Sequence, residues 1–184
     1  MPLTRPFEIK LLTTDTSTFS DIADITAITN EAYMFSEGDF WHQNFDYQRT
    51  SFDEISGFIK KKELLAAVSE DTVAGILHKY PLSKDTFGFG MLTVSPEYRK
   101  NHIGTMLINE AEKLAIIKNY KKMQLELLKP VHYKHPDKEF LTKWYKKLGY
   151  NHISTVPYTR LYPHRAHYLK IPCNFEIYEK KLVK

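Results

Sequence analysis

One stretch of the sequence, Gly88–Tyr120, constrains the fold more than any other, because it has the pattern of a strand, a short basic loop and a helix. Met91–Val94 is a compact apolar run with β-branched character, and Ser95 and Pro96 end it. A polar loop follows at residues 98–102. Beyond it, apolar residues recur at helical spacing and predict one buried face, formed by Ile103, Leu107, Ala111, Leu114 and Ile117.

The junction between this loop and the helix has the properties of an anion-binding site. The first N–H groups of a helix lack internal partners, and the helix dipole adds partial positive charge there. Gly104 lies in the first turn, and Arg99, Lys100 and His102 precede it. Helix ends of this kind bind phosphates, and a glycine permits close approach of the backbone. The sequence therefore indicates a phosphate-bearing ligand at Arg99–Gly104, although an ordinary solvated loop would have a similar composition.

The remaining elements predict a mixed α/β domain. Their order along the chain is β α α β β β α β α β β, which favours three layers around a mixed sheet. The first predicted helix has Ser20 or Asp21 as its cap, and Glu70 and Asp71 form a hairpin turn. The predicted strands besides Met91–Val94 are Phe7–Leu12, Leu64–Ser69, Val73–Lys79, Lys122–Leu128, Asn151–Val156 and Cys173–Glu179.

Two motifs carry a resemblance to a known family. Arg99-Lys-Asn-His-Ile-Gly104, after a strand and Ser-Pro, resembles the acetyl-CoA-binding motif of the GNAT superfamily of N-acetyltransferases, Gln/Arg-x-x-Gly-x-Gly/Ala. His102 stands where the first glycine is usual. Trp144-Tyr145-Lys-Lys-Leu-Gly149-Tyr150 resembles the signature of the family's fourth helix. The resemblance covers most of the chain and implies a GNAT-like three-layer α/β domain, with a mixed, mostly antiparallel sheet of about seven strands and about four helices.

The resemblance also implies which residues bind acetyl-CoA. Backbone N–H groups of the loop would cradle the pyrophosphate, and the strand at Leu92–Val94 would offer backbone groups to the pantetheine arm. The family's frequent Asn, seven residues before the tyrosine of the fourth helix, is Lys138 here, which could reach a phosphate instead. The expected cofactor-binding residues are Leu92, Thr93, Val94, Arg99, Lys100, Asn101, His102, Ile103, Gly104, Thr105 and Lys138.

Three residues are the candidates for acid–base catalysis, one acid and two alternative bases. By resemblance, Tyr145 donates a proton to the departing CoA thiolate, whereas its spacing alone favours a buried core aromatic. A general base must take the proton from the attacking amine. Glu126 is the best candidate, because alternation places it opposite Met123, Leu125 and Leu127, although a solvated strand glutamate has the same pattern. His78 is a second candidate base.

Two irregular, aromatic-rich segments are the candidate lids over the amine. Phe35–Tyr47 also contains several acids, and Pro157–Pro172 contains Tyr158 and Tyr162. Aromatic rings and carboxylates attract cations, but either segment could be packing alone. The expected substrate-binding residues are Tyr33, Asp39 and Tyr158.

Composition limits the partners and the compartment. The chain has 184 residues, a net charge of +4 and a single cysteine, so we expect one domain over residues 1–184 in a reducing compartment, either the cytoplasm or, as the open alternative, the nucleus. No membrane span, signal peptide or contiguous basic stripe is seen, which argues against membrane and nucleic-acid partners. The histidine pairs at 132 and 135 and at 164 and 167 lack further ligands, so no metal is expected.

The sequence therefore predicts an enzyme that transfers acetyl from acetyl-CoA to a primary amine, on a small molecule or a peptide, by direct attack. The alternative is a non-catalytic domain of the same fold that binds acyl-CoA or regulates. The segment Pro157–Pro172 could equally be the interface of a homodimer.

Overall fold

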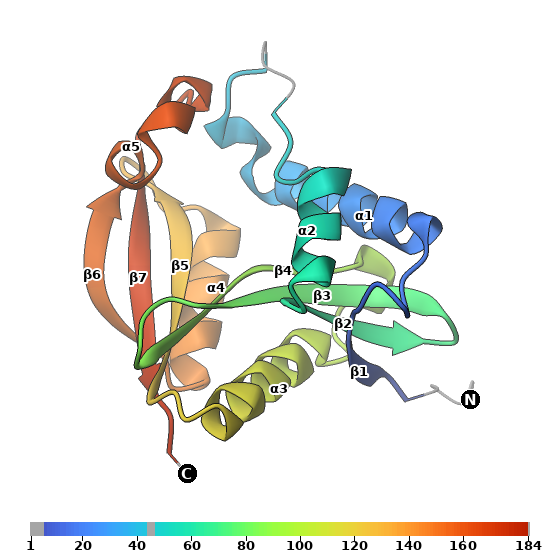
Figure 1. The fold of residues 1–184 in the computed structure, drawn as a ribbon. Coiled ribbons are helices and arrows are strands. Elements are labelled where there is room, and N and C mark those ends of the chain that lie inside the picture. Colours follow the sequence, from blue (N-terminus) through green and yellow to red (C-terminus); the bar gives the residue numbers. More distant parts are fainter. Residues whose placement is uncertain (1–5, 44–46, 184) are drawn as a thin grey trace.

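A computed structural model describes residues 6–43 and 47–183, and it has a seven-stranded sheet in the order β1-β2-β3-β4-β5-β7-β6 (Figure 1). Neighbouring strands are antiparallel except β4 and β5, which are parallel. The strands are β1 Glu8–Leu11, β2 Leu64–Ser69, β3 Thr72–Pro81, β4 Thr86–Val94, β5 Lys122–Pro130, β6 Asn151–Pro157 and β7 Cys173–Lys181. The helices are α1 Phe19–Glu37, α2 Phe52–Lys60, α3 Ile103–Ile117, α4 Pro136–Lys147 and the single turn α5 Tyr158–Leu161. Short 3-10 segments occupy Gly38–Phe40, Pro96–Tyr98 and Pro163–Tyr168. The predicted fold class is confirmed.

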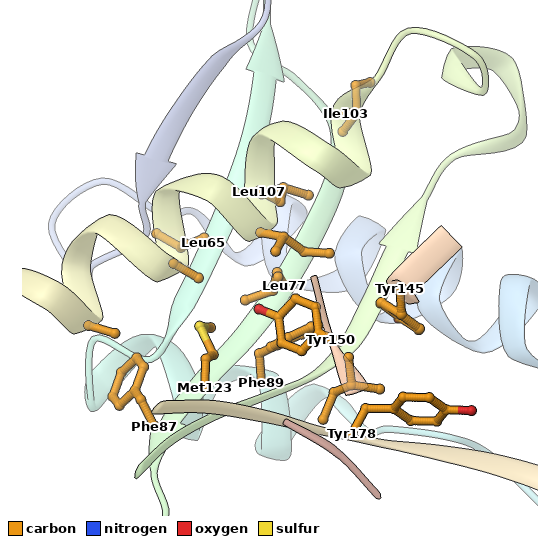
Figure 2. Close-up of a cluster of buried hydrophobic side chains, with 14 of the residues drawn as sticks. Leu65, Leu77, Phe87, Phe89, Ile103, Leu107, Met123, Tyr145, Tyr150 and Tyr178 are labelled. Atoms are coloured by element: carbon orange, nitrogen blue, oxygen red, sulfur yellow. The ribbon is translucent and has the colours of Figure 1, made fainter. Parts of the chain in front are cut away.

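The sheet is covered by helices on both faces, and the pleat of the strands separates two cores. Along β2, Leu64 and Ala66 pack against α1 and α2, whereas Leu65 and Ala67 pack against α3. In Figure 1, α1 and α2 lie above β2–β4 and α3 lies below them. Figure 2 shows the second core, in which residues of α3 meet aromatic side chains of β4, α4 and β7. A third, aromatic cluster joins Trp41 and its neighbours to β5, β7 and α5.

The predicted hairpin turn between β2 and β3 is confirmed, whereas the predicted cap of α1 is not. Glu70 and Asp71 both have positive φ, 49° and 66°, as a tight hairpin between β2 and β3 requires. The cap of α1 is a correction. Thr18, not Ser20 or Asp21, is the N-cap, and Asp21 is its reciprocal partner in a capping box.

The strands β4 and β5 diverge in the middle of the sheet. They pair only between Thr86–Phe89 and Lys122–Leu125, and beyond these residues each strand continues without the other. Figure 1 shows β2–β4 and β5–β7 as two arms that spread apart. A bulge in β4 marks the start of the opening, where Met91 has a φ of 50° and the register with β3 shifts. We call this opening between β4 and β5 the splay.

Candidate active site

The loop before α3 presents backbone N–H groups that have no partner in the protein. His102 is the N-cap of α3, but no side chain caps the helix. In the part of the chain that the structure describes, the N–H groups of Ile103, Gly104 and Thr105 donate no hydrogen bond. Lys100 and His102 are exposed beside them. The arrangement is that of an anion-binding helix terminus.

The backbone at His102 explains why glycine is usual at this position of the motif. Its φ and ψ of 58° and 14° are left-handed, a conformation that glycine adopts freely and that costs other residues about 1–2 kcal/mol. His102 therefore departs from the family pattern in its side chain but keeps a backbone that a glycine would favour. The side chain is exposed, so it leaves the N–H groups of the first turn accessible.

Gly104 has a packing role that the sequence did not reveal. A Cβ at this position would lie 3.0 Å from the Trp144 ring of α4 and 3.8 Å from a methyl group of Leu92. The missing side chain thus lets the start of α3 pack directly against α4. A substitution at Gly104 would disturb this contact as well as any bound phosphate, so it cannot report on ligand binding alone.

Helical periodicity brings α1 and α4 together through the splay. Tyr33 and Glu37 lie one turn apart on α1, and Lys138 and Tyr145 lie two turns apart on α4, so each pair shares a face. Helix α1 packs against β4 and α4 against β5, on opposite faces of the sheet. The two faces meet where the strands have separated, and Lys138 forms an ion pair with Glu37 there.

This ion pair corrects the prediction for Lys138. The side chains of Lys138 and Glu37 are only 3% and 6% exposed. Lys138 therefore satisfies a carboxylate of α1 and is not available to a phosphate at the loop before α3. We remove it from the candidate cofactor site.

Tyr145 combines a core position with a hydroxyl group that no described residue engages. The residue is 6% exposed, and its ring packs edge-on against Phe89 and Tyr150. Burial, and then the nearby Tyr33, raise its pKa well above the usual range for tyrosine. The phenol therefore stays protonated as a hydrogen-bond donor, although the raised pKa also makes it a weaker acid. Figure 2 shows Tyr145 at the edge of the aromatic core.

Glu126 lies on β5 just past the last residue that pairs with β4. Its carboxylate accepts a hydrogen bond from the Tyr162 hydroxyl at 3.2 Å, and no other hydrogen bond to it is made within the described residues. Burial raises the pKa of Glu126, and the bond from Tyr162 partly offsets this. Tyr80 of β3 is close enough that the Glu126 charge contributes to its raised pKa, after burial. The carboxylate is thus half-buried and accepts a hydrogen bond from a phenol, whereas the alternative expectation was a solvated strand glutamate.

His78, the second candidate base, has a different role. It stacks on Phe58 at 3.7 Å between ring centroids, and it contacts Glu63 at 3.3 Å. Burial lowers its pKa, and Glu63 partly reverses the shift. The imidazole therefore lies under α2, on the face of the sheet that also carries Tyr80, whose ring centroid is 4.8 Å away. These contacts favour a structural role.

Of the predicted substrate residues, Tyr33 lies near Tyr145 at the splay, and the other two lie in the segments after α1 and β6. Tyr158 is 4% exposed and packs with Trp41 and Phe175 in the aromatic cluster, which favours packing over substrate contact. Asp39 is exposed in the segment Gly38–Phe40. Residues 44–46 of the predicted acidic lid lie outside the described residues.

Arg49 is the site residue that sequence reasoning missed. It lies two positions before Ser51, the N-cap of α2, and its guanidinium carbon is 5.1 Å from the centroid of the Tyr33 ring. The signal that could have identified it is an arginine two positions after the aromatic-rich segment Phe35–Tyr47. Nothing in the sequence pairs it with α1.

A second set of aromatic contacts involves Trp41, Tyr47 and Arg165. Tyr47 stacks on Trp41 at 4.0 Å between ring centroids, and the guanidinium carbon of Arg165 lies 5.4 Å from the centroid of the Tyr47 ring. This stack connects the segment before α2 to the segment after α5, which are far apart in the sequence. The predicted lids are therefore adjacent in space, and they pack on each other.

Known proteins with this architecture identify the family. Residues 60–152, half of the chain, match the family model of the acetyltransferase (GNAT) domain, and the chain belongs to this family. No curated protein sequence matches the chain. An N-acetyltransferase from Staphylococcus aureus Mu50 has 16% identity and a TM-score of 0.68, with 97% of this chain and 99% of that chain covered.

Two further solved structures have the same fold and were determined with a coenzyme. The yncA protein of Salmonella typhimurium, with its cofactor acetyl-CoA, has 14% identity and a TM-score of 0.69, over 97% of this chain and 95% of that one. An aminoglycoside 6'-N-acetyltransferase complexed with coenzyme A has 19% identity and a TM-score of 0.68, over 96% and 98%.

Two absences apply to the described residues only. They contain no group of three or more His, Cys, Asp or Glu side chains that could hold a metal ion. None of their helices is long and apolar enough to cross a membrane.

Proposed function

We propose that this chain, acting as one domain, transfers the acetyl group of acetyl-CoA to a primary amine by direct attack. The observation that carries the proposal is the splay, which leaves strand edges unpaired next to an uncapped helix terminus, a protonated phenol and a partly buried carboxylate. The family membership and the coenzyme complexes of the structural neighbours support the choice of acetyl-CoA.

In this proposal the N–H groups of residues 103–105 bind the pyrophosphate, with Arg99, Lys100, Asn101 and His102 around it. The unpaired edge of β4 at Leu92, Thr93 and Val94 binds the pantetheine arm. The Thr93 side chain is buried, so only its backbone could contribute. This arrangement uses the helix dipole and backbone donors, which do not depend on side-chain identity.

The chemistry follows from the two titratable groups at the splay. The amine nitrogen attacks the thioester carbon, the tetrahedral adduct collapses, and the carbon–sulfur bond breaks. Glu126 takes the proton that the amine loses, directly or through a water, and Tyr145 gives a proton to the departing thiolate. The products are an amide and free CoA, and no covalent enzyme intermediate forms.

Incubation with acetyl-CoA and a panel of amines, with detection of released thiol, tests this function. Amine-dependent thiol release with an N-acetylated product in the mass spectrum supports it. Tight binding of acetyl-CoA without thiol release for any amine would contradict it and favour the non-catalytic alternative.

The phosphate site can be tested at Lys100, whose side chain is exposed and has no structural contact to lose. Lys100→Glu should weaken acetyl-CoA binding by roughly three- to tenfold at low ionic strength, because exposed charge contacts are each worth about 0.2–1 kcal/mol. The effect should shrink at high salt, where the Debye length is short. Calorimetric titration measures it. Lys113→Glu, on α3 well beyond the loop that holds Lys100, is the control; it also removes an exposed ion pair with Glu110. Equal losses of acetyl-CoA affinity for both variants would contradict the assigned site.

The role of Glu126 can be tested by the pH profile. The base must be ionised, so kcat/KM should fall as the pH drops through a pKa that burial has raised above the ordinary 4.5. The hydrogen bond from Tyr162 lowers that pKa, so Tyr162→Phe should move the acidic limb to higher pH. Glu126→Gln should remove the limb. An identical acidic limb in all three proteins would show that another group is the base.

A further inference from the structure

Arg49 is a half-buried cation that forms no ion pair with any described residue. Among residues 6–43 and 47–183, no carboxylate lies within salt-bridge distance of its guanidinium. Two carboxylates are close enough to act on its charge, Glu37 and Glu54, and each already has a partner. Glu37 pairs with Lys138, and Glu54 accepts a hydrogen bond from the Thr50 hydroxyl at 2.6 Å. A buried guanidinium carries five donors and is costly to leave unpaired.

The position of Arg49 is central to the face of the sheet that would receive the amine. Its positive charge acts on titratable groups from several elements, and for each of them burial is the larger influence on the pKa. These groups are Tyr33 of α1, Tyr47, His78 and Tyr80 of β3, Tyr158 of α5, and Tyr162. The geometry agrees with this position, because the guanidinium carbon of Arg49 lies 5.1 Å from the centroid of the Tyr33 ring of α1.

Glu126 is the complementary charge on the same face. It accepts a hydrogen bond from the Tyr162 hydroxyl, and it has no cationic partner within the described residues. The pKa values of Tyr80 and Tyr162 respond to both Glu126 and Arg49, after burial. Among the described residues, this face therefore holds an anion, Glu126, and a cation, Arg49, that form no ion pair, with the two tyrosines near both of them.

We infer that the acceptor is a small zwitterion, an amino acid or a similar amino-carboxylate, whose amino group lies at Glu126 and whose carboxylate is bound by Arg49. This inference rests on the proposed acetyl transfer. Planar guanidinium groups bind carboxylates in a fork geometry, which gives orientation as well as affinity. Polyamines and aminoglycosides have no anion to offer Arg49, and they would place a second cation beside it.

The experiment compares matched acceptors. Thiol release from acetyl-CoA is measured with the twenty amino acids, several dipeptides, the C-terminal amide of each, spermidine and an aminoglycoside. For at least one pair, the free carboxylate should give a kcat/KM at least roughly tenfold higher than its amide, as charged hydrogen bonds of about 1.5–3 kcal/mol imply.

Variants test whether the preference for a carboxylate acceptor over its amide depends on Arg49. Arg49→Gln should raise KM for the carboxylate acceptor by roughly tenfold or more and change that for the amide by less than about twofold, while KM for acetyl-CoA stays constant. Lys61→Gln, which removes an exposed cation at the other end of α2, is the control and should keep the preference. A melting curve for each variant shows whether the fold is intact.

The outcomes distinguish failure of the zwitterion inference from failure of the proposed acetyl transfer. Turnover with amides or polyamines equal to or better than with carboxylates overturns the zwitterion but leaves acetyl transfer in place. An unchanged carboxylate preference in a folded Arg49→Gln variant overturns the role of Arg49. If Arg49→Gln does not fold, the comparison of acceptors with the unmodified protein still decides. No thiol release with any amine overturns the proposed function, and the inference with it.

Discussion

Replacing Lys138 by methionine should lower the free energy of unfolding by about 3–5 kcal/mol, because it leaves the buried carboxylate of Glu37 without its partner. Both side chains are almost fully buried, and Lys138 also lies 5.7 Å from the centroid of the Phe40 ring. Methionine has a similar length and no charge, so the loss reports on the unpaired carboxylate more than on packing. Denaturant unfolding monitored by tryptophan fluorescence measures it.

The double variant Lys138→Met with Glu37→Gln is the control for this prediction. Removing both charges should restore most of the lost stability, since replacing a buried ion pair by neutral groups is often nearly neutral. Lys129→Met removes a lysine from a more exposed network with Glu139 and Glu176, and it should cost less. A loss below about 1 kcal/mol in Lys138→Met would show that Glu37 finds another partner or water.

The same ion pair shows where sequence reasoning reaches its limit. Lys138 and Glu37 are 101 positions apart, and each has the pattern of an ordinary polar helix residue. Their contact exists only because β4 and β5 separate and let α1 meet α4. Lys138 stands where the family usually has an asparagine, and this position suggested a contact with phosphate. In the folded protein it pairs instead with the carboxylate of Glu37. The unpaired charge of Arg49 could not be predicted for the same reason.

Local signals predicted the elements well, because each depends on a few neighbouring residues. The strand–loop–helix stretch, the hairpin at Glu70 and Asp71, and the alternation of β5 were all readable. The cap of α1 was wrong although its signal was present, since Thr18 and Asp21 have the spacing of a capping box. Glu126 could be assigned to a face of β5, but its burial and its bond to Tyr162 depend on the segment after α5.

Tyr145→Phe should lower kcat by at least tenfold and leave stability almost unchanged. General acid catalysis is typically worth about 10²–10⁴-fold, and a water could replace part of it. The hydroxyl forms no hydrogen bond with any described residue, so its removal breaks nothing in the folded protein, and the ring that packs on Phe89 remains. Affinity for acetyl-CoA should change little. Turnover and melting temperature are measured on the same preparation, with an acceptor found in the thiol-release panel.

Tyr150→Phe is the matched control, because the two rings lie 6.2 Å apart in the same core and differ in what their hydroxyl groups do. The Tyr150 hydroxyl donates to Glu112 at 2.7 Å, so its loss should cost about 1.5–3 kcal/mol and spare turnover. Catalysis and packing thus predict opposite signatures for two tyrosines in one aromatic cluster. Normal turnover in Tyr145→Phe would assign that residue to packing alone, and protonation of the thiolate would then fall to water, because the other two fully buried phenols described in this core, Tyr150 and Tyr178, each donate to a carboxylate.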